Sequence, residues 1–132
     1  MTSPTSPEEP EQLTVVDEEP QPGVLVVRLT GWLDLATAPG AEARLQELLD
    51  TRTPQSIVLD LSRTEFLGSA GVAVLLRVRR WALGHGAEPP CLVGLTAGAR
   101  RTLHGLGLLE MFSTADAVSL APRLERLLSL IV

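Results

Sequence analysis

A small hydroxyl between two glycines, in the stretch Gly68, Ser69, Ala70, Gly71, is the pattern in this sequence with the clearest chemical potential. A serine in that setting can serve as a nucleophile, hold or carry a phosphate, or cap a helix. The nucleophile elbow G-x-S-x-G is excluded, because Leu67 stands where that motif has its first glycine. A Walker loop needs a lysine and the chain has none, and the stretch does not supply G-x-G-x-x-G either. Capping and covalent phosphorylation remain.

Both remaining roles have a physical basis at the start of a helix. Serine is among the best N-cap residues, worth about 1 kcal/mol over alanine, and an apolar helical pattern begins at Ala70. A helix start also offers unpaired N–H groups and the positive end of the helix dipole, which tolerate a phosphate. A phosphate on Ser69 would act as a charge switch on a docking surface. From the residues alone, capping is the favoured interpretation. Hydrolysis is not, because the only histidines, His85 and His104, lie near predicted helix ends.

The elements that must position Ser69 alternate between strands and helices. Strands are predicted at 13–16, 24–31, 56–62 and 91–96, with a brief edge strand at 111–112. Helices are predicted after a cap at Asp34 or Thr37, from about 70 to 83, over about 97–104, and in a last region that a capping box at 113–116 opens. The first two strands are expected to be antiparallel and the later strand–helix–strand units right-handed. The pattern predicts one small mixed α/β domain over 12–132, preceded by a disordered, acidic and proline-rich tail at 1–11.

Composition limits the function classes. The formal net charge is −5 and the sequence pI about 5.0, which argues against a nucleic-acid partner. The lone cysteine, Cys91, excludes an internal disulfide and a multi-cysteine zinc site, and it is expected to be a buried thiol in a strand. No metal or cofactor is expected. The N-terminus has no basic and apolar signal pattern and no apolar run could span a bilayer, so a cytoplasmic protein without membrane insertion is expected.

Four stretches of the chain resemble one known family. They are "VVRLTGWLD", "SIVLDLSRTEFLGSAGVAVLL", "CLVGLTAGARRTLHGLGL" and "MFSTADAV", in the right order and spacing. Together they are similar to a STAS domain of the bacterial anti-sigma factor antagonist type. The resemblance implies a four- or five-stranded mixed sheet with about four helices, mainly on one face.

The resemblance also implies a function without catalysis. Such an antagonist binds an anti-sigma factor, a serine kinase with a histidine-kinase-like ATP site, and thereby releases a sigma factor. The kinase phosphorylates the first serine of a D-S-[ST]-G motif, which weakens the complex, and a PP2C-type phosphatase restores it. Ser69 matches that serine. Gly68 and Ala70 replace the acid and the second hydroxyl of the motif. These departures keep open an alternative, an interaction subunit that is never phosphorylated, such as an accessory of a lipid-transport ATPase complex.

The resemblance finally marks a partner surface around the serine. Asp34 matches the acid of the family's G-x-L-D motif and is expected either to contact the partner or to cap the following helix. Trp32 is expected to be an exposed anchor or to tuck into the core. The remaining candidate partner-binding residues are Ser62, Arg63, Gly68, Ala70 and Gly71.

Overall fold

The computed structural model describes residues 12–115, which form six strands, three α-helices and one 3₁₀ turn. The strands are β1 (Leu13–Gln21), β2 (Val24–Leu33), β3 (Ser56–Asp60), β4 (Thr64–Leu67), β5 (Cys91–Val93) and β6 (Ser113–Ala115). The helices are α1 (Ala38–Arg52), α2 (Ser69–Gly84) and α3 (Ala97–Gly105), and the 3₁₀ turn η1 is Leu109–Met111. None of the helices within this range is long and apolar enough to cross a membrane.

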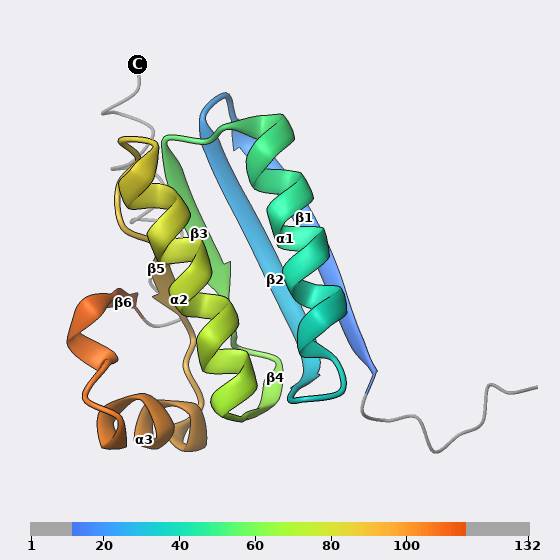
Figure 1. Cartoon of the computed structure of the whole chain (residues 1–132), viewed down its shortest axis with the longest axis vertical. Coiled ribbons are helices and arrows are strands. Elements are labelled where there is room, and N and C mark those ends of the chain that lie inside the picture. Colours follow the sequence, from blue (N-terminus) through green and yellow to red (C-terminus); the bar gives the residue numbers. More distant parts are fainter. Residues whose placement is uncertain (1–11, 116–132) are drawn as a thin grey trace, which may run out of the picture.

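The strands form one mixed sheet in the order β1-β2-β3-β5-β6, and β4 pairs with the end of β2 beyond β3 (Figure 1). β1 and β2 are antiparallel, as predicted, and every other pair is parallel. A chain that returns to parallel strands needs crossover segments, and α1, α2 and α3 supply them. The predicted mixed α/β fold is confirmed, with one strand more than the expected maximum of five.

Several elements differ from the predicted ones: β1 runs to Gln21 instead of Val16, and β5 ends at Val93 instead of Thr96. β4 was not anticipated, and the edge strand is Ser113–Ala115 instead of Met111–Phe112. Ser113 therefore lies in a strand parallel to β5, so the prediction that it caps a helix is wrong. The expected tail at 1–11 and the last helical region around Pro122 lie outside the described residues.

Alternation along β2 divides the buried side chains between the two faces of the sheet. Leu25, Val27 and Leu29 belong to the main core, which also holds the buried side chains of α1, α2 and α3. Val24 and Val26 point to the other face and share a smaller cluster with strand residues, including the buried Cys91. All three described α-helices thus contribute to one core, in agreement with the expected one-sided layer of helices.

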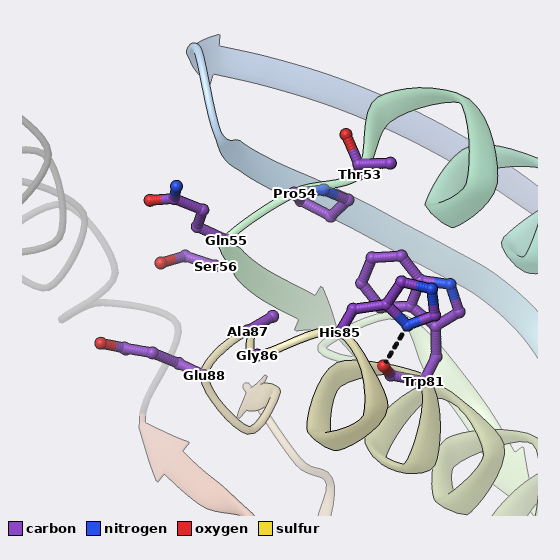
Figure 2. Close-up of a pocket in the computed structure, with 9 residues that line it drawn as sticks. All are labelled: Thr53, Pro54, Gln55, Ser56, Trp81, His85, Gly86, Ala87 and Glu88. Carbon is purple, nitrogen blue, oxygen red and sulfur yellow. Dashed lines mark hydrogen bonds between the residues drawn. The ribbon is translucent and has the colours of Figure 1, made fainter.

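The end of α2 far from Ser69 carries a stacked pair of rings. The His85 imidazole lies over the Trp81 indole with ring centroids 4.0 Å apart, and His85 Nδ1 is 2.8 Å from the carbonyl oxygen of Trp81 (Figure 2). Beside this pair is a hollow of about 540 Å³, bounded by the loop from Thr53 to Ser56 and by the turn through Gly86 and Glu88.

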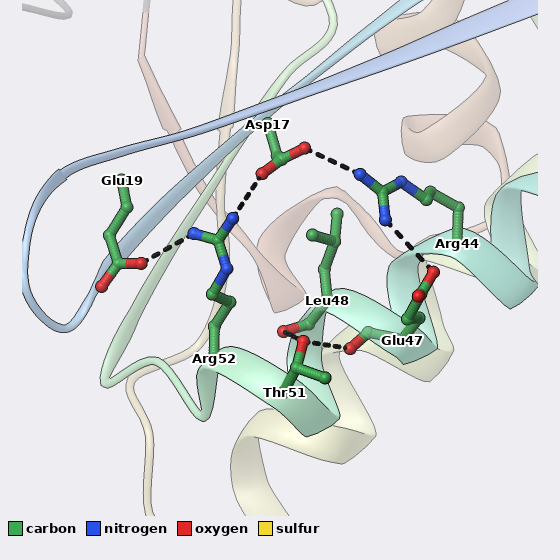
Figure 3. Close-up of polar contacts among 7 residues, drawn as sticks. All are labelled: Asp17, Glu19, Arg44, Glu47, Leu48, Thr51 and Arg52. Atoms are coloured by element: carbon green, nitrogen blue, oxygen red, sulfur yellow. Dashed lines mark hydrogen bonds and ion pairs between the residues drawn. The ribbon is translucent and has the colours of Figure 1, made fainter.

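An ion-pair cluster fastens β1 to α1 (Figure 3). Asp17 of β1 lies between Arg44 and Arg52 of α1, with N–O distances of 3.0 and 2.9 Å. Arg52 also binds Glu19 at 2.7 Å, and Arg44 binds Glu47 at 3.1 Å. Because β1 is an edge strand held by β2 alone, this cluster gives it a second attachment.

Candidate functional site

The start of α2 places Ser69 on the surface as the first helical residue. Gly68 is the N-cap, with extended backbone (φ −94°, ψ −179°), and its N–H donates to the carbonyl of Leu33 at 3.1 Å. Its own carbonyl accepts the first helical bond, from Val72, at 3.0 Å. The prediction that Ser69 caps the helix is therefore wrong, because the turn is made one residue earlier. The Ser69 side chain is exposed.

The start of α2 can accept a negative charge. No side chain caps it and no acidic residue lies in its first turn. The first N–H groups of a helix have no partner within it, and the helix dipole adds a partial positive charge there. A phosphate on the Ser69 hydroxyl would supply both acceptors and negative charge at this point.

Gly71 allows α2 to start close against the sheet. A Cβ at this position would lie 2.7 Å from the Leu33 side chain and backbone oxygen, and 2.9 Å from Leu67. Gly71 is buried, so a partner would meet its neighbours and not Gly71 itself. Ala70 is half-buried and packs against the main core.

Two aromatic rings lie beside the cap residue Gly68. Trp32 is 36% exposed and Phe66 46% exposed, and their ring centroids are 5.5 Å apart. The indole Nε1–H of Trp32 donates to Glu65 at 3.4 Å. A Cβ on Gly68 would lie 3.0 Å from the Phe66 ring, so this ring explains why a larger residue fits poorly at 68. Trp32 is thus outside the core, and Phe66 is a site residue that sequence reasoning missed. No local pattern marks Phe66, because Glu65 and Phe66 of the four-residue strand β4 are both exposed.

Asp34 organises the loop between β2 and α1. Its Oδ1 accepts the N–H groups of Ala36 and Thr37 at 3.0 and 3.1 Å. Thr37 is the N-cap of α1, but its hydroxyl donates to the carbonyl of Trp32 at 2.7 Å and does not cap the helix. Asp34 is half-exposed, so this loop role leaves part of it open to a partner.

Ser62 and Arg63 lie in the loop between β3 and β4. The Ser62 hydroxyl donates to Oδ1 of Asp60 at 2.7 Å, and the Ser62 N–H donates to the same oxygen at 3.0 Å. Burial raises the pKa of Asp60, but these two bonds and the Arg28 guanidinium 3.1 Å away outweigh burial and leave the pKa below its ordinary value. Arg63 is exposed, and its carbonyl accepts the Gly31 N–H. Ser62 thus holds the loop, whereas Arg63 is accessible.

Among residues 12–115, no side chain forms a hydrogen bond with the Ser69 hydroxyl. His85 lies at the opposite end of the 16-residue helix α2, about 24 Å away at 1.5 Å per residue. The 540 Å³ hollow beside it contains none of the predicted site residues. Within residues 12–115 no group of three or more His, Cys, Asp or Glu side chains could hold a metal ion. The candidate site is therefore a surface with an exposed acceptor hydroxyl.

Known proteins share this fold and much of this sequence. The model of the STAS domain family matches residues 16–121. The anti-sigma-F factor antagonist RsfB of Mycobacterium tuberculosis is 33% identical over 105 residues, covering 77% of this chain and 81% of that protein. A solved anti-sigma factor antagonist from Mycobacterium paratuberculosis superposes with a TM-score of 0.67 at 29% identity, covering 80% of this chain and 87% of that chain.

A third similarity concerns the fold alone. The phosphorylated form of the Bacillus cell fate determinant SpoIIAA has a TM-score of 0.65 at 20% identity, with 84% of this chain and 99% of that chain covered. The order of the strands in the sheet, the match to the family model and the similarity to RsfB all indicate the same family. The chain belongs to the STAS domain family and, within it, to the anti-sigma factor antagonists.

Proposed function

We propose that this protein is a cytoplasmic, non-enzymatic switch that binds an anti-sigma factor serine kinase and releases a sigma factor. Phosphorylation of Ser69 ends the interaction, and a PP2C-type phosphatase restores it. The observation that carries the proposal is the exposed Ser69 at the start of α2, where no side chain caps the helix. The chain is also related to anti-sigma factor antagonists.

The charge of the phosphate is the physical basis of the switch. It adds about −1.5 to −2 charges at pH 7 at a helix start that has no acid of its own. The fold tolerates this charge because the helix dipole favours it. The partner then faces a dianion where it met a neutral hydroxyl. Asp34, Trp32, Arg63, Gly68 and Ala70 form the surface that we assign to the partner, and Ser62 and Gly71 hold that surface in place.

A second function remains a candidate because of Gly68 and Ala70. Neither the acid nor the second hydroxyl of the family motif is present, and the Phe66 ring fills the space beside residue 68. A protein of this kind that escapes phosphorylation would act as an interaction subunit only, for example in a lipid-transport ATPase complex.

The test is phosphorylation by purified anti-sigma factor kinases of the source organism, with ATP, followed by mapping of the phosphate by mass spectrometry. We expect modification at Ser69 alone. Ser69→Ala should bind the kinase with unchanged affinity, and Ser69→Asp should raise Kd at least about tenfold, or 1.4 kcal/mol.

Ser113 offers a matched control, since it is an exposed serine on β6, away from the start of α2. Ser113→Asp adds the same charge and should leave Kd unchanged. Phosphate at another residue, or none from a kinase that binds, refutes the switch and favours the interaction subunit. Equal effects of the two Asp variants would mean that total charge and not position controls binding.

A further inference from the structure

A cleft of about 360 Å³ lies between β4 and α3, next to the start of α2. Glu65, Phe66 and Leu67 line it from the strand, and Gly98, Ala99, Arg101 and Thr102 line it from the helix. In Figure 1, α3 lies beside β4 and the first turn of α2, at the same end of the molecule as Ser69. No predicted site residue lines this cleft.

The cleft is open because small residues face it. A Cβ on Gly98 would find only the Arg101 guanidinium within 4 Å, at 3.9 Å. β4 pairs with β2 alone, so helix α3, and not another strand, flanks its outer side. The hollow is therefore a consequence of the four-residue strand and of the missing side chain at Gly98.

The cleft combines an apolar wall with one carboxylate, Glu65, and one cation, Arg101. Phe66 is 46% exposed, although it is a large aromatic side chain. Four arginines of the described chain form ion pairs: Arg28, Arg44, Arg52 and Arg77. Arg101 is exposed and forms none within residues 12–115. The Glu65 carboxylate shares the cleft and accepts the Trp32 indole N–H at 3.4 Å, so Arg101 is left without an ion pair among the described residues and can bind a carboxylate from a partner.

The cleft lies close enough to Ser69 that a protein bound at Ser69 also covers it. Leu67 is two residues from Ser69, and the Phe66 ring is 3.0 Å from the Cβ position of Gly68. A specific protein interface covers about 800 Å² on each partner. A kinase centred on the Ser69 hydroxyl thus covers the mouth of the cleft as well.

We propose that the cleft is the specificity pocket for the serine kinase partner, which inserts an apolar side chain against Phe66 and pairs a neighbouring carboxylate with Arg101. The inference rests on the proposed function and deepens it. Aromatic and arginine side chains are the residues that most often dominate interface energies. Arg101 selects an acidic partner segment, since an arginine fork matches a carboxylate.

Two pairs of variants test the cleft against matched positions. Arg101→Glu reverses the charge in the cleft, and Arg80→Glu does the same at an exposed arginine of α2 that also has no ion pair within residues 12–115. Gly98→Trp fills the cleft. Gly84→Trp adds the same side chain at the far end of α2, where a Cβ would meet nothing within 4 Å.

The measurement is Kd by isothermal titration with the kinase that phosphorylates Ser69, after circular dichroism has established that each variant is folded. We expect Arg101→Glu and Gly98→Trp each to raise Kd at least about tenfold, and the two control variants to leave it within about twofold. The Arg101→Glu effect should shrink at 1 M NaCl, where the Debye length is about 3 Å.

The outcomes separate this inference from the proposed function. If Ser69 is phosphorylated but both cleft variants bind like their controls, the cleft is not the pocket and the switch stands. If Gly98→Trp weakens binding and Arg101→Glu does not, the claim about the acidic partner segment is wrong. If no kinase binds the wild-type chain, both the function and the pocket are refuted.

Discussion

Asp60 is the last residue of β3 and is 4% exposed. Both of its carboxylate oxygens accept hydrogen bonds. Two donors from Ser62 and the Arg28 guanidinium stabilise its charged form, so its pKa lies below the ordinary value although burial raises it. A carboxylate with a lowered pKa stabilises the fold above its unfolded-state pKa. That contribution is lost as the pH falls through the lowered value.

Asp60→Asn should reduce stability mainly near neutral pH. At pH 7 we expect a loss of about 1–3 kcal/mol, because the Arg28 and Ser62 donors lose a charged acceptor. The difference from wild type should narrow below about pH 4, where the ordinary aspartate pKa lies, because Asp60 of the unfolded chain then binds a proton before the native carboxylate does. Urea unfolding at several pH values between 7 and 3 measures this difference. A difference that stays constant over that range would show that the Asp60 charge is not what stabilises the loop.

The position of Ser69 at the start of a helix could be predicted from the sequence, but the geometry of the cap could not. Its place between a strand and a helix follows from hydrophobic patterning. Which residue forms the cap depends on a bond from the Gly68 N–H to the carbonyl of Leu33, 35 positions earlier. No local pattern carries that information. The same holds for the ring of Phe66 against Gly68, which only the pairing of β2 with β4 brings together with Trp32.

At the scale of elements, β1 depends on α1 as well as on β2. Alternate residues of β1 are exposed, so the strand buries little apolar surface of its own. Asp17 is the centre of the ion-pair cluster, since it binds both Arg44 and Arg52, and its side chain is only 16% exposed.

Asp17→Ala should lower the free energy of unfolding by about 1 kcal/mol, the upper end for pairs whose arginines remain partly exposed. Glu18→Ala is the control, because Glu18 is the exposed neighbour on the same strand and forms no ion pair within residues 12–115. Chemical denaturation at low and high salt measures both. High salt should reduce the loss of stability caused by Asp17→Ala, because it screens the ion pairs. If the loss of stability is the same at both salt concentrations, it comes from packing and not from the ion pairs.

Three of the longer elements could be predicted from sequence, whereas two short strands, β4 and β6, could not be placed. β2, α1 and α2 have ten to sixteen residues with a clear period, and their positions were found from sequence. β4 has four residues, of which Glu65 and Phe66 are both exposed. Its side chains therefore do not alternate between buried and exposed positions, which is the usual sign of a strand. β6 has three residues and is defined by its pairing with β5. Such strands are created by the sheet that they join.

At the scale of the whole molecule, the two ends of α2 carry different features. The start of α2 lies at the same end as α3 (Figure 1), and the exposed serine, the aromatic pair and the cleft are found there. The other end carries the loop after α1 and the Trp81–His85 stack (Figure 2). The helix α2 joins them, with Ser69 at its first residue and the stack at its last turn.

The two tryptophans of the chain, one at each end, make the protein its own fluorescent reporter. Trp32 is 36% exposed beside the proposed docking surface, and Trp81 is 8% exposed under His85. Kinase binding should shift the emission of Trp32 to shorter wavelength, because the indole leaves water, and should leave Trp81 unaffected. Trp81→Phe should keep the spectral change on titration with a tryptophan-free kinase, and Trp32→Phe should lose it. The reverse result would place the partner at the opposite end. Each molecule thus carries a sensor and an internal reference, about one helix length apart.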